Sequence, residues 1–215
     1  MQYAHEHKPL QFKEYQGPPP VLPAYCARLG DQARDYLESR DLDPLLAGHN
    51  GWYPSDMDVP RIVIPCMNTA GICYWQARRM DDSQDLRYDS PTYPRGDSIV
   101  VVYPEERRPS PRLFIFEGPM DALAAAAFGH AGVALMGNNP DPEAIDNIVR
   151  CFGRTHAPFV IVPDNDDLAA GTQLLGNFAT RGVVTKVALL TGGKDLCDLS
   201  IPSRDKFLQR ALKVK

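Results

Sequence analysis

The sequence has no excess of positive charge and no cysteine pair of the Cys-x-x-Cys type. Its 215 residues include 23 Lys and Arg against 27 Asp and Glu, so the formal net charge is −4 and the chain as a whole lacks a strongly basic footprint. The five cysteines are an odd number and are widely spaced, which argues against a disulfide framework and against a zinc ribbon. We therefore expect free, buried thiols and no bound zinc.

Long apolar runs are also absent. No stretch approaches the roughly 18 consecutive apolar residues of a membrane span, and residues 1–13 are polar. We therefore expect no membrane segment, no secretory signal and a cytoplasmic location. The Gly-x-x-x-x-Gly-Lys-Ser/Thr motif is missing, so unwinding of nucleic acid is not expected from this chain. The hydrophobic content of 44% is ordinary for one large globular domain or two small ones.

Proline, charge and periodicity divide the chain into segments. Residues 1–23 are polar and then proline-rich, which favours an extended arm. Residues 24–103 indicate a small α+β domain, with a helix over 31–40, mostly loop over 41–60, a hairpin over 61–78 and a strand over 98–103. The charged, proline-containing segment 104–111 is predicted to be a linker. Residues 112–215 alternate apolar strands with helices, which is typical of an α/β domain with a mainly parallel sheet flanked by helices.

Acidic side chains follow three predicted strands of this second domain. They are Glu117 and Asp121 after the strand at 113–116, Asp164 and Asp166 after 159–163, and Asp195 and Asp198 after 183–190. Open α/β sheets bind ligands at the carboxyl ends of their strands, so we expect these acids to converge on one site. Each acid alone could instead cap the helix that follows it. Three such strand ends together favour a chemical role.

Together these motifs resemble the Toprim domain that bacterial-type DNA primases, topoisomerases and some nucleases share. The resemblance covers about residues 112–200 and is carried by Glu117-Gly118-x-x-Asp121-Ala122-Leu123, Asp164-x-Asp166 and Gly193-Lys194-Asp195-x-x-Asp198. The family pattern Asp-x-Asp-x-x-Gly would place its glycine two positions before Gly171. The second aspartate is therefore either Asp166 or Asp167.

Residues 31–103 resemble the basal domain that precedes Toprim in bacterial-type primases. The shared positions are Tyr36-Leu37-x-x-Arg40, Arg61-Ile62-x-x-Pro65, Gly71, Arg78, Arg87-Tyr88-x-Ser90-Pro91 and Arg95-Gly96. The stretch from Arg61 to Arg112 contains no lysine, and the planar arginine fork suits phosphate. One interpretation is a basic groove. The other is a solvated arginine surface that neighbouring acids balance.

The resemblance implies the catalytic core of a DNA primase, a nucleotidyltransferase that makes short RNA primers on single-stranded DNA from ribonucleoside triphosphates. It implies Mg²⁺ or Mn²⁺ at Asp164 and Asp166, completed by Glu117, Asp121, Asp195 and Asp198. Glu117 is either a metal ligand or a general base. The side chains expected to contact the nucleotide or DNA are Arg78, Arg87, Arg95 and Lys194.

Template recognition and unwinding would then come from a separate module or a replicative helicase. A compact primase of a phage or mobile element fits this description, as does the core of a longer primase-helicase. Two other functions remain open. A Toprim nuclease would use the same acids for hydrolysis, and a non-catalytic adaptor would only bind single-stranded nucleic acid.

Overall fold

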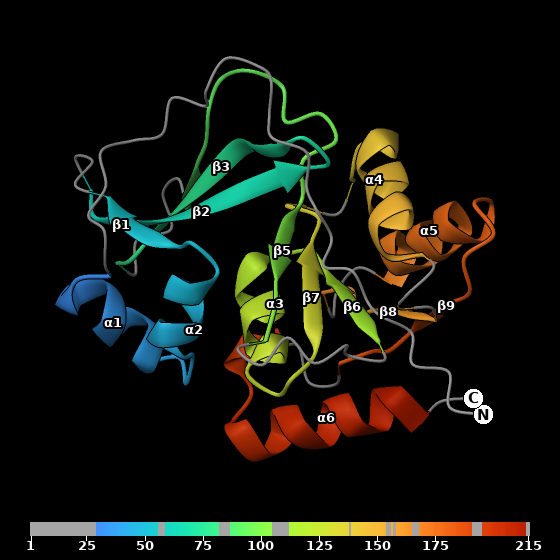
Figure 1. Ribbon diagram of the computed structural model, residues 1–215. Helices are drawn as coiled ribbons and strands as arrows, with labels where there is room; N and C mark the ends of the chain where they lie inside the picture. The colour runs from blue at the N-terminus through green and yellow to red at the C-terminus, as the bar shows by residue number, and fades with distance from the viewer. Residues whose placement is uncertain are drawn as a thin grey trace, which may run out of the picture.

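The structure is a computed structural model that describes residues 29–55, 59–81, 87–104, 112–137, 139–153, 156, 158–164, 168–190 and 195–213. The elements form a four-stranded antiparallel sheet and a five-stranded sheet that helices flank (Figure 1). This confirms the predicted fold class, a parallel-rich sheet preceded by a smaller α+β part. The predicted arm at residues 1–23 and most of the predicted linker lie outside the described residues.

The first half contains two short helices and the antiparallel sheet. The helices are α1 (Asp31–Glu38) and α2 (Pro44–His49), and the strands, in spatial order, are β1 (Tyr53–Ser55), β2 (Arg61–Asn68), β3 (Gly71–Arg79) and β4 (Tyr88–Asp89). The predicted hairpin is confirmed as β2 and β3. Helix α2 lies in a region predicted as mostly loop. Its start is fixed by the Asp43 carboxylate, which accepts a hydrogen bond from the Leu45 N–H at 2.8 Å, and its 6 residues are too few for a periodic pattern.

The second sheet has the strand order β5-β7-β6-β8-β9. Its strands are β5 (Val100–Val102), β6 (Leu113–Phe116), β7 (Ala131–Ala134), β8 (Phe159–Ile161) and β9 (Thr185–Val187). All neighbours pair in parallel except β5, which is antiparallel to β7. The helices are α3 (Pro119–Ala126), α4 (Pro142–Phe152), α5 (Leu168–Ala179), the 3₁₀ turn η1 (Leu196–Asp198) and α6 (Ile201–Lys213). None of the described helices is long and apolar enough to cross a membrane.

Strand β5 ties the two sheets together. It lies within the range predicted for the first domain, yet it pairs with β7 of the second sheet. Just before it, Ile99 exchanges two backbone hydrogen bonds with Met67 at the end of β2, at 2.8 and 2.9 Å. The change from one sheet to the other therefore occurs between β4 and β5. The domain division at residues 104–111 stays a prediction.

One hydrophobic core runs through both halves of the chain. It includes Leu37 of α1, Ile62 of β2, Phe114 of β6 and Leu123 of α3, all fully buried, and it continues into α6. A second core fills the other face of the five-stranded sheet, under α4 and α5 (Figure 1). Strand β6 is apolar at every position because helices cover both of its faces. The shared core holds the antiparallel sheet against α3.

Helix α3 crosses β7 at Gly132 without room for a side chain. A Cβ atom at this position would lie 2.7 Å from both the Cα and the carbonyl oxygen of Ala122. These are backbone atoms that cannot rotate away. Gly132 therefore sets how closely α3, and with it Asp121, approaches the sheet.

We expect Gly132→Ala to lower the free energy of unfolding by about 1 to 3 kcal/mol, as overpacking of a tight core does. Gly176→Ala on α5 is the matched control, because the same methyl group meets no atom within 4 Å. That change should raise stability by about 0.5 to 1 kcal/mol, since Ala is the better helix former. Urea unfolding of the three proteins measures both effects. An unchanged stability of Gly132→Ala would contradict the close approach.

Candidate functional site

The carboxyl ends of β6 and β8 lie side by side because these strands pair in parallel, with Phe114 opposite Val160 and Ile115 opposite Ile161. Glu117 directly follows β6, and Asp164 comes soon after β8. Pro119 begins α3, so Asp121 lies in the first turn of that helix at the same edge. The register of two parallel strands thus places carboxylates from separate segments next to one another.

A cavity of about 110 Å³ lies between this edge and the first half of the chain. The acids that line it are Asp121, Asp164, Asp195 and Asp198, and the other lining residues are Arg40, Arg78, Arg87, Tyr88, Gly118, Met120 and Cys197. The structure therefore brings together four of the six acids that the sequence singled out. Glu117 is half-buried and is not among the residues that line the cavity. Asp166 and Lys194 lie outside the described residues.

Asp121 is the most deeply buried of these acids, with 6% of its surface exposed. Its Oδ1 accepts a hydrogen bond from the Cys197 N–H at 2.8 Å, which joins α3 to η1. Burial raises the pKa of the Asp121 carboxyl to about 7; the Cys197 N–H opposes this rise, and the charges of Asp195 and Asp164 add to it. The charges of Asp164 and Asp195 thus disfavour ionisation of Asp121, and a cation bound in the cavity would relieve this repulsion.

Helix α5 begins close behind Asp164. A Cβ atom at Gly171 would lie 2.9 Å from Cγ of Pro163, the residue that precedes Asp164. This glycine is two positions later than in the family pattern, and it is where α5 approaches the end of β8.

Arginines from the first half of the chain form the opposite wall of the cavity. The guanidinium of Arg78 is buried, and it donates to the Tyr36 hydroxyl from Nε at 2.7 Å and to the Tyr88 hydroxyl from Nη1 at 2.8 Å. It also lies 5.1 Å from the centroid of the Tyr88 ring. These partners are neutral, so they orient the guanidinium without cancelling its charge. Arg87 is exposed and lines the same cavity.

Arg95 has a different place. Its Nη1 donates to the Met136 carbonyl at 2.6 Å, and its Nη2 donates to the Asn139 carbonyl at 2.9 Å. Met136 has a positive φ of 58°, an uncommon conformation for a residue with a side chain. Arg95 thus holds the turn after β7 and is not among the residues that line the cavity. A contact between Arg95 and a nucleotide stays a prediction that this geometry does not favour.

Arg40, to which the sequence motifs assigned no role, lines the cavity from the turn after α1. Its Nη1 lies 3.5 Å from Oδ1 of Asp198. The available signal was its position in Tyr36-Leu37-x-x-Arg40, one of the patterns that carry the basal-domain resemblance. That pattern marks the residue but not its neighbour across the cavity.

The donor set suits a hard cation, since carboxylate oxygens are the ligands that Mg²⁺ prefers. Among the described residues, however, no three His, Cys, Asp or Glu side chains are grouped closely enough to hold a metal ion. The predicted ligand Asp166 is not among them. The described cysteines Cys66, Cys73, Cys151 and Cys197 are free thiols. Cys66 and Cys197 are buried as predicted, whereas Cys73 and Cys151 are only half-buried.

Comparisons with known proteins agree with this arrangement. Residues 114–200 match the family model described as Toprim-like. The similar solved structures include the Aquifex aeolicus primase, comprising zinc-binding and RNA polymerase domains (17% identity, TM-score 0.66). They also include the RNA polymerase domain of Mycobacterium tuberculosis primase (19%, 0.62) and the E. coli primase catalytic core (17%, 0.59). No curated protein matches the sequence.

Each of these structural matches covers 85% of this chain. In turn, this chain spans 55% of the Aquifex aeolicus chain and 76% and 77% of the other two. The match to the family model and the agreement in fold confirm a Toprim-like domain and the fold of a primase catalytic core.

The pKa of Asp121 gives a testable pH dependence for the metal-free protein. Because its folded pKa of about 7 lies above the ordinary value of 3.8, its contribution to stability is lost as the pH rises between about 4 and 7. Asp121→Asn keeps the shape and the hydrogen-bond acceptor but cannot ionise. With a chelator present, urea unfolding should show the variant gaining stability relative to the wild type from about pH 5 to about pH 8. A constant difference at the two pH values would contradict the raised pKa.

Proposed function

We propose that this chain is the catalytic core of a DNA primase, which makes short RNA primers on single-stranded DNA from ribonucleoside triphosphates. The observation that carries the proposal is the cavity in which arginines of the first half face the acids of the Toprim-like half. Nucleotidyl transfer needs both the acids and the arginines. The acids would hold the metal that neutralises charge on the reacting oxygens, and the arginines would bind the triphosphate.

The cofactor of this proposal is Mg²⁺ or Mn²⁺. Asp121, Asp164, Asp195 and Asp198 present oxygen ligands to the cavity. Burial raises the pKa of the Asp121 carboxyl, and the charges of Asp195 and Asp164 add to this rise. We propose that Asp164 and Asp166 are the main ligands, and that Glu117 and the remaining acids complete the site directly or through water. When bound, the metal would stabilise the charge that develops on the transferred phosphate. Zinc is not expected.

The roles of the remaining residues follow from their places. Arg78 is oriented by two tyrosine hydroxyls and Arg87 is accessible, so both suit contacts with phosphate. Glu117 lies at the end of β6 and would act as a ligand or as the base that receives the proton of the attacking hydroxyl. Lys194 would be a further phosphate contact by its place in the Gly193-Lys194-Asp195 motif.

The proposed partners are a single-stranded DNA template and ribonucleoside triphosphates in the cytoplasm. The Aquifex aeolicus primase has a zinc-binding domain beside its RNA polymerase domain, and this chain spans 55% of that structure. We propose that a separate template-recognition module or a replicative helicase completes the function, as would suit a phage or mobile-element primase. A Toprim nuclease would need the acids but has no incoming nucleotide for the arginine wall to hold.

Primer synthesis is the direct test. With single-stranded DNA, labelled ribonucleotides and Mg²⁺, the chain should make short RNA, and Glu117→Gln should eliminate synthesis with little loss of stability. Arg87→Ala should raise KM for the nucleotide by about ten- to a hundredfold, because it removes a charge-assisted phosphate contact. If the wild type cleaves DNA, makes no primer on any template and is unaffected by Arg87→Ala, the nuclease function replaces the primase function.

Metal binding can be tested without turnover. Mg²⁺ or Mn²⁺ at about 100 times its Kd should raise the melting temperature by about 5 to 10 °C, because only the folded protein assembles the site. Asp164→Asn should abolish this shift. Asp31→Asn removes an equally charged but exposed carboxylate on α1 and should leave the shift intact. A full shift in the Asp164→Asn protein would refute the proposed site.

A further inference from the structure

An open groove of about 820 Å³ adjoins the acidic cavity. It shares Arg40, Cys197 and Asp198 with that cavity, and Tyr36 and Met80 are among its other lining residues. Its volume is in the range of sites that hold a small molecule the size of a nucleotide, whereas the acidic cavity alone is too small. A ligand in the groove would reach the acids past Arg40.

Arg40 is held in place from two directions. Its backbone carbonyl accepts a hydrogen bond at 2.6 Å from Arg204 of α6, a side chain that is only 1% exposed. Its guanidinium lies 5.2 Å from the centroid of the Tyr36 ring, and a cation over an aromatic face is stabilised there. The backbone and the guanidinium are therefore both positioned before any ligand binds.

The contact between Arg40 and Asp198 is loose by comparison. The closest atoms are 3.5 Å apart, and the two side chains are 25% and 45% exposed. A partly exposed ion pair of this kind contributes little to stability. A phosphate group offers a guanidinium two shorter, parallel hydrogen bonds and more charge, so it would displace the carboxylate.

Tyr36 links Arg40 to the arginine wall. Its ring lies beside the guanidinium of Arg40, and its hydroxyl accepts a hydrogen bond from Nε of Arg78 at 2.7 Å. The two guanidinium groups therefore flank one side chain, and both line the acidic cavity. A chain of phosphates could contact both of them while the nucleoside occupies the groove.

We propose that Arg40 is a further phosphate-binding residue, which exchanges Asp198 for the triphosphate of a nucleotide whose nucleoside part lies in the groove. This inference rests on the proposed function, because the nucleotide is the substrate of that function. The exchange also releases the carboxylate of Asp198 into the acidic cavity. Arg40 thus pairs with Asp198 until an anionic substrate binds.

Calorimetric titration of the full chain with ATP, pyrophosphate and adenosine, in Mg²⁺, tests this assignment. Arg40→Gln should weaken the binding of ATP and of pyrophosphate by about 10- to 100-fold and leave adenosine unchanged. Arg34→Gln is the matched control, because it removes the same charge from the neighbouring helix α1, at a residue that lines neither space. Arg40→Lys, which keeps the charge but not the fork, should lose less affinity. Melting curves check that each variant folds. If Arg40→Gln does not fold, the affinities of Arg40→Lys are compared with those of the wild type instead.

A second comparison separates phosphate binding from a purely structural ion pair. If Arg40 served only to pair with Asp198, Arg40→Gln would have no further effect on ATP binding in an Asp198→Asn protein. We expect the full loss of affinity in that background. Equal ATP affinities of Arg40→Gln and Arg34→Gln would overturn the assignment, and so would a wild type that binds neither ATP nor pyrophosphate.

Primer synthesis distinguishes a failure of the proposed function from a failure of this assignment. A wild type that makes no primer but loses ATP affinity on Arg40→Gln would refute the primase function and retain the phosphate contact. A wild type that makes primers, while Arg40→Gln binds ATP normally, would support the primase function and refute the phosphate contact of Arg40.

Discussion

The buried guanidinium of Arg204 joins the two halves of the molecule at the site. It donates to the carbonyls of Leu196 and Cys197 in η1 and to those of Arg40 and Asp41 in the turn after α1. A buried charge is costly unless hydrogen bonds satisfy it, and here four carbonyl oxygens do so. One side chain of α6 therefore fixes the turn that carries an arginine against the turn that carries two aspartates. The distance across the candidate active site depends on this connection.

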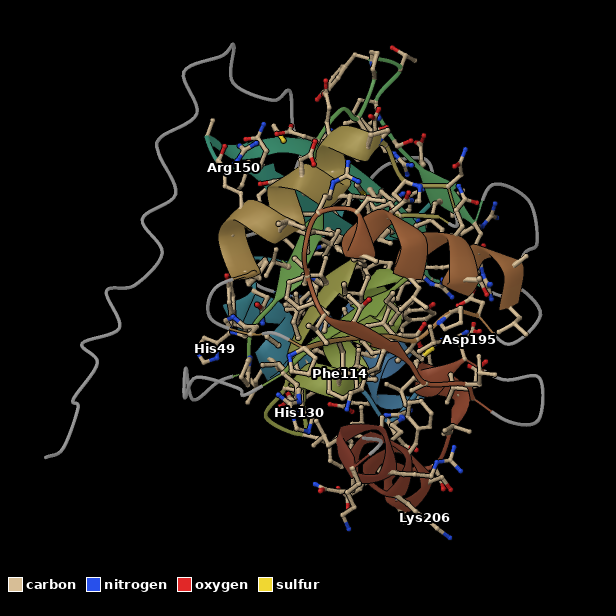
Figure 2. All side chains as sticks on the ribbon, turned by 90° about the vertical axis from the view of Figure 1, so that its right-hand side faces the viewer. His49, Phe114, His130, Arg150, Asp195 and Lys206 are labelled. Carbon is tan, nitrogen blue, oxygen red and sulfur yellow. The ribbon has the colours of Figure 1, made fainter. Side chains whose placement is uncertain are left out.

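Strand register and helix packing also place the residues of the candidate site. The parallel pairing of β6 with β8 brings Asp121 and Asp164 to one edge, and the absence of a side chain at Gly132 lets α3 approach that edge. The shared core then holds the antiparallel sheet, with Arg78 on β3, against α3. Figure 2 shows Asp195 near the edge of the molecule and Phe114 nearer its middle, next to His130. The polar site thus lies at the rim of the core that positions it.

Local charge separation lets a chain with a net charge of −4 place three arginines, Arg40, Arg78 and Arg87, around one acidic cavity. The acids gather at the strand ends, and arginines gather on the facing wall, where tyrosine hydroxyls orient Arg78 without neutralising it. The two walls attract one another and an anionic substrate bound with a divalent cation would complement both. The net charge of the whole chain does not reveal this separation of acids and arginines.

Features that depend on neighbouring residues could be predicted from the sequence. The apolar run Leu113–Phe116, the glycine and proline that follow it, and the hairpin at β2 and β3 are local patterns, and all of them appear in the structure. Three other features became visible in the folded molecule: β5 joins the second sheet, Arg95 binds the turn after β7, and Arg40 faces Asp198. These contacts join residues far apart in the chain, and their formation depends on how whole elements pack, which no short pattern of residues encodes.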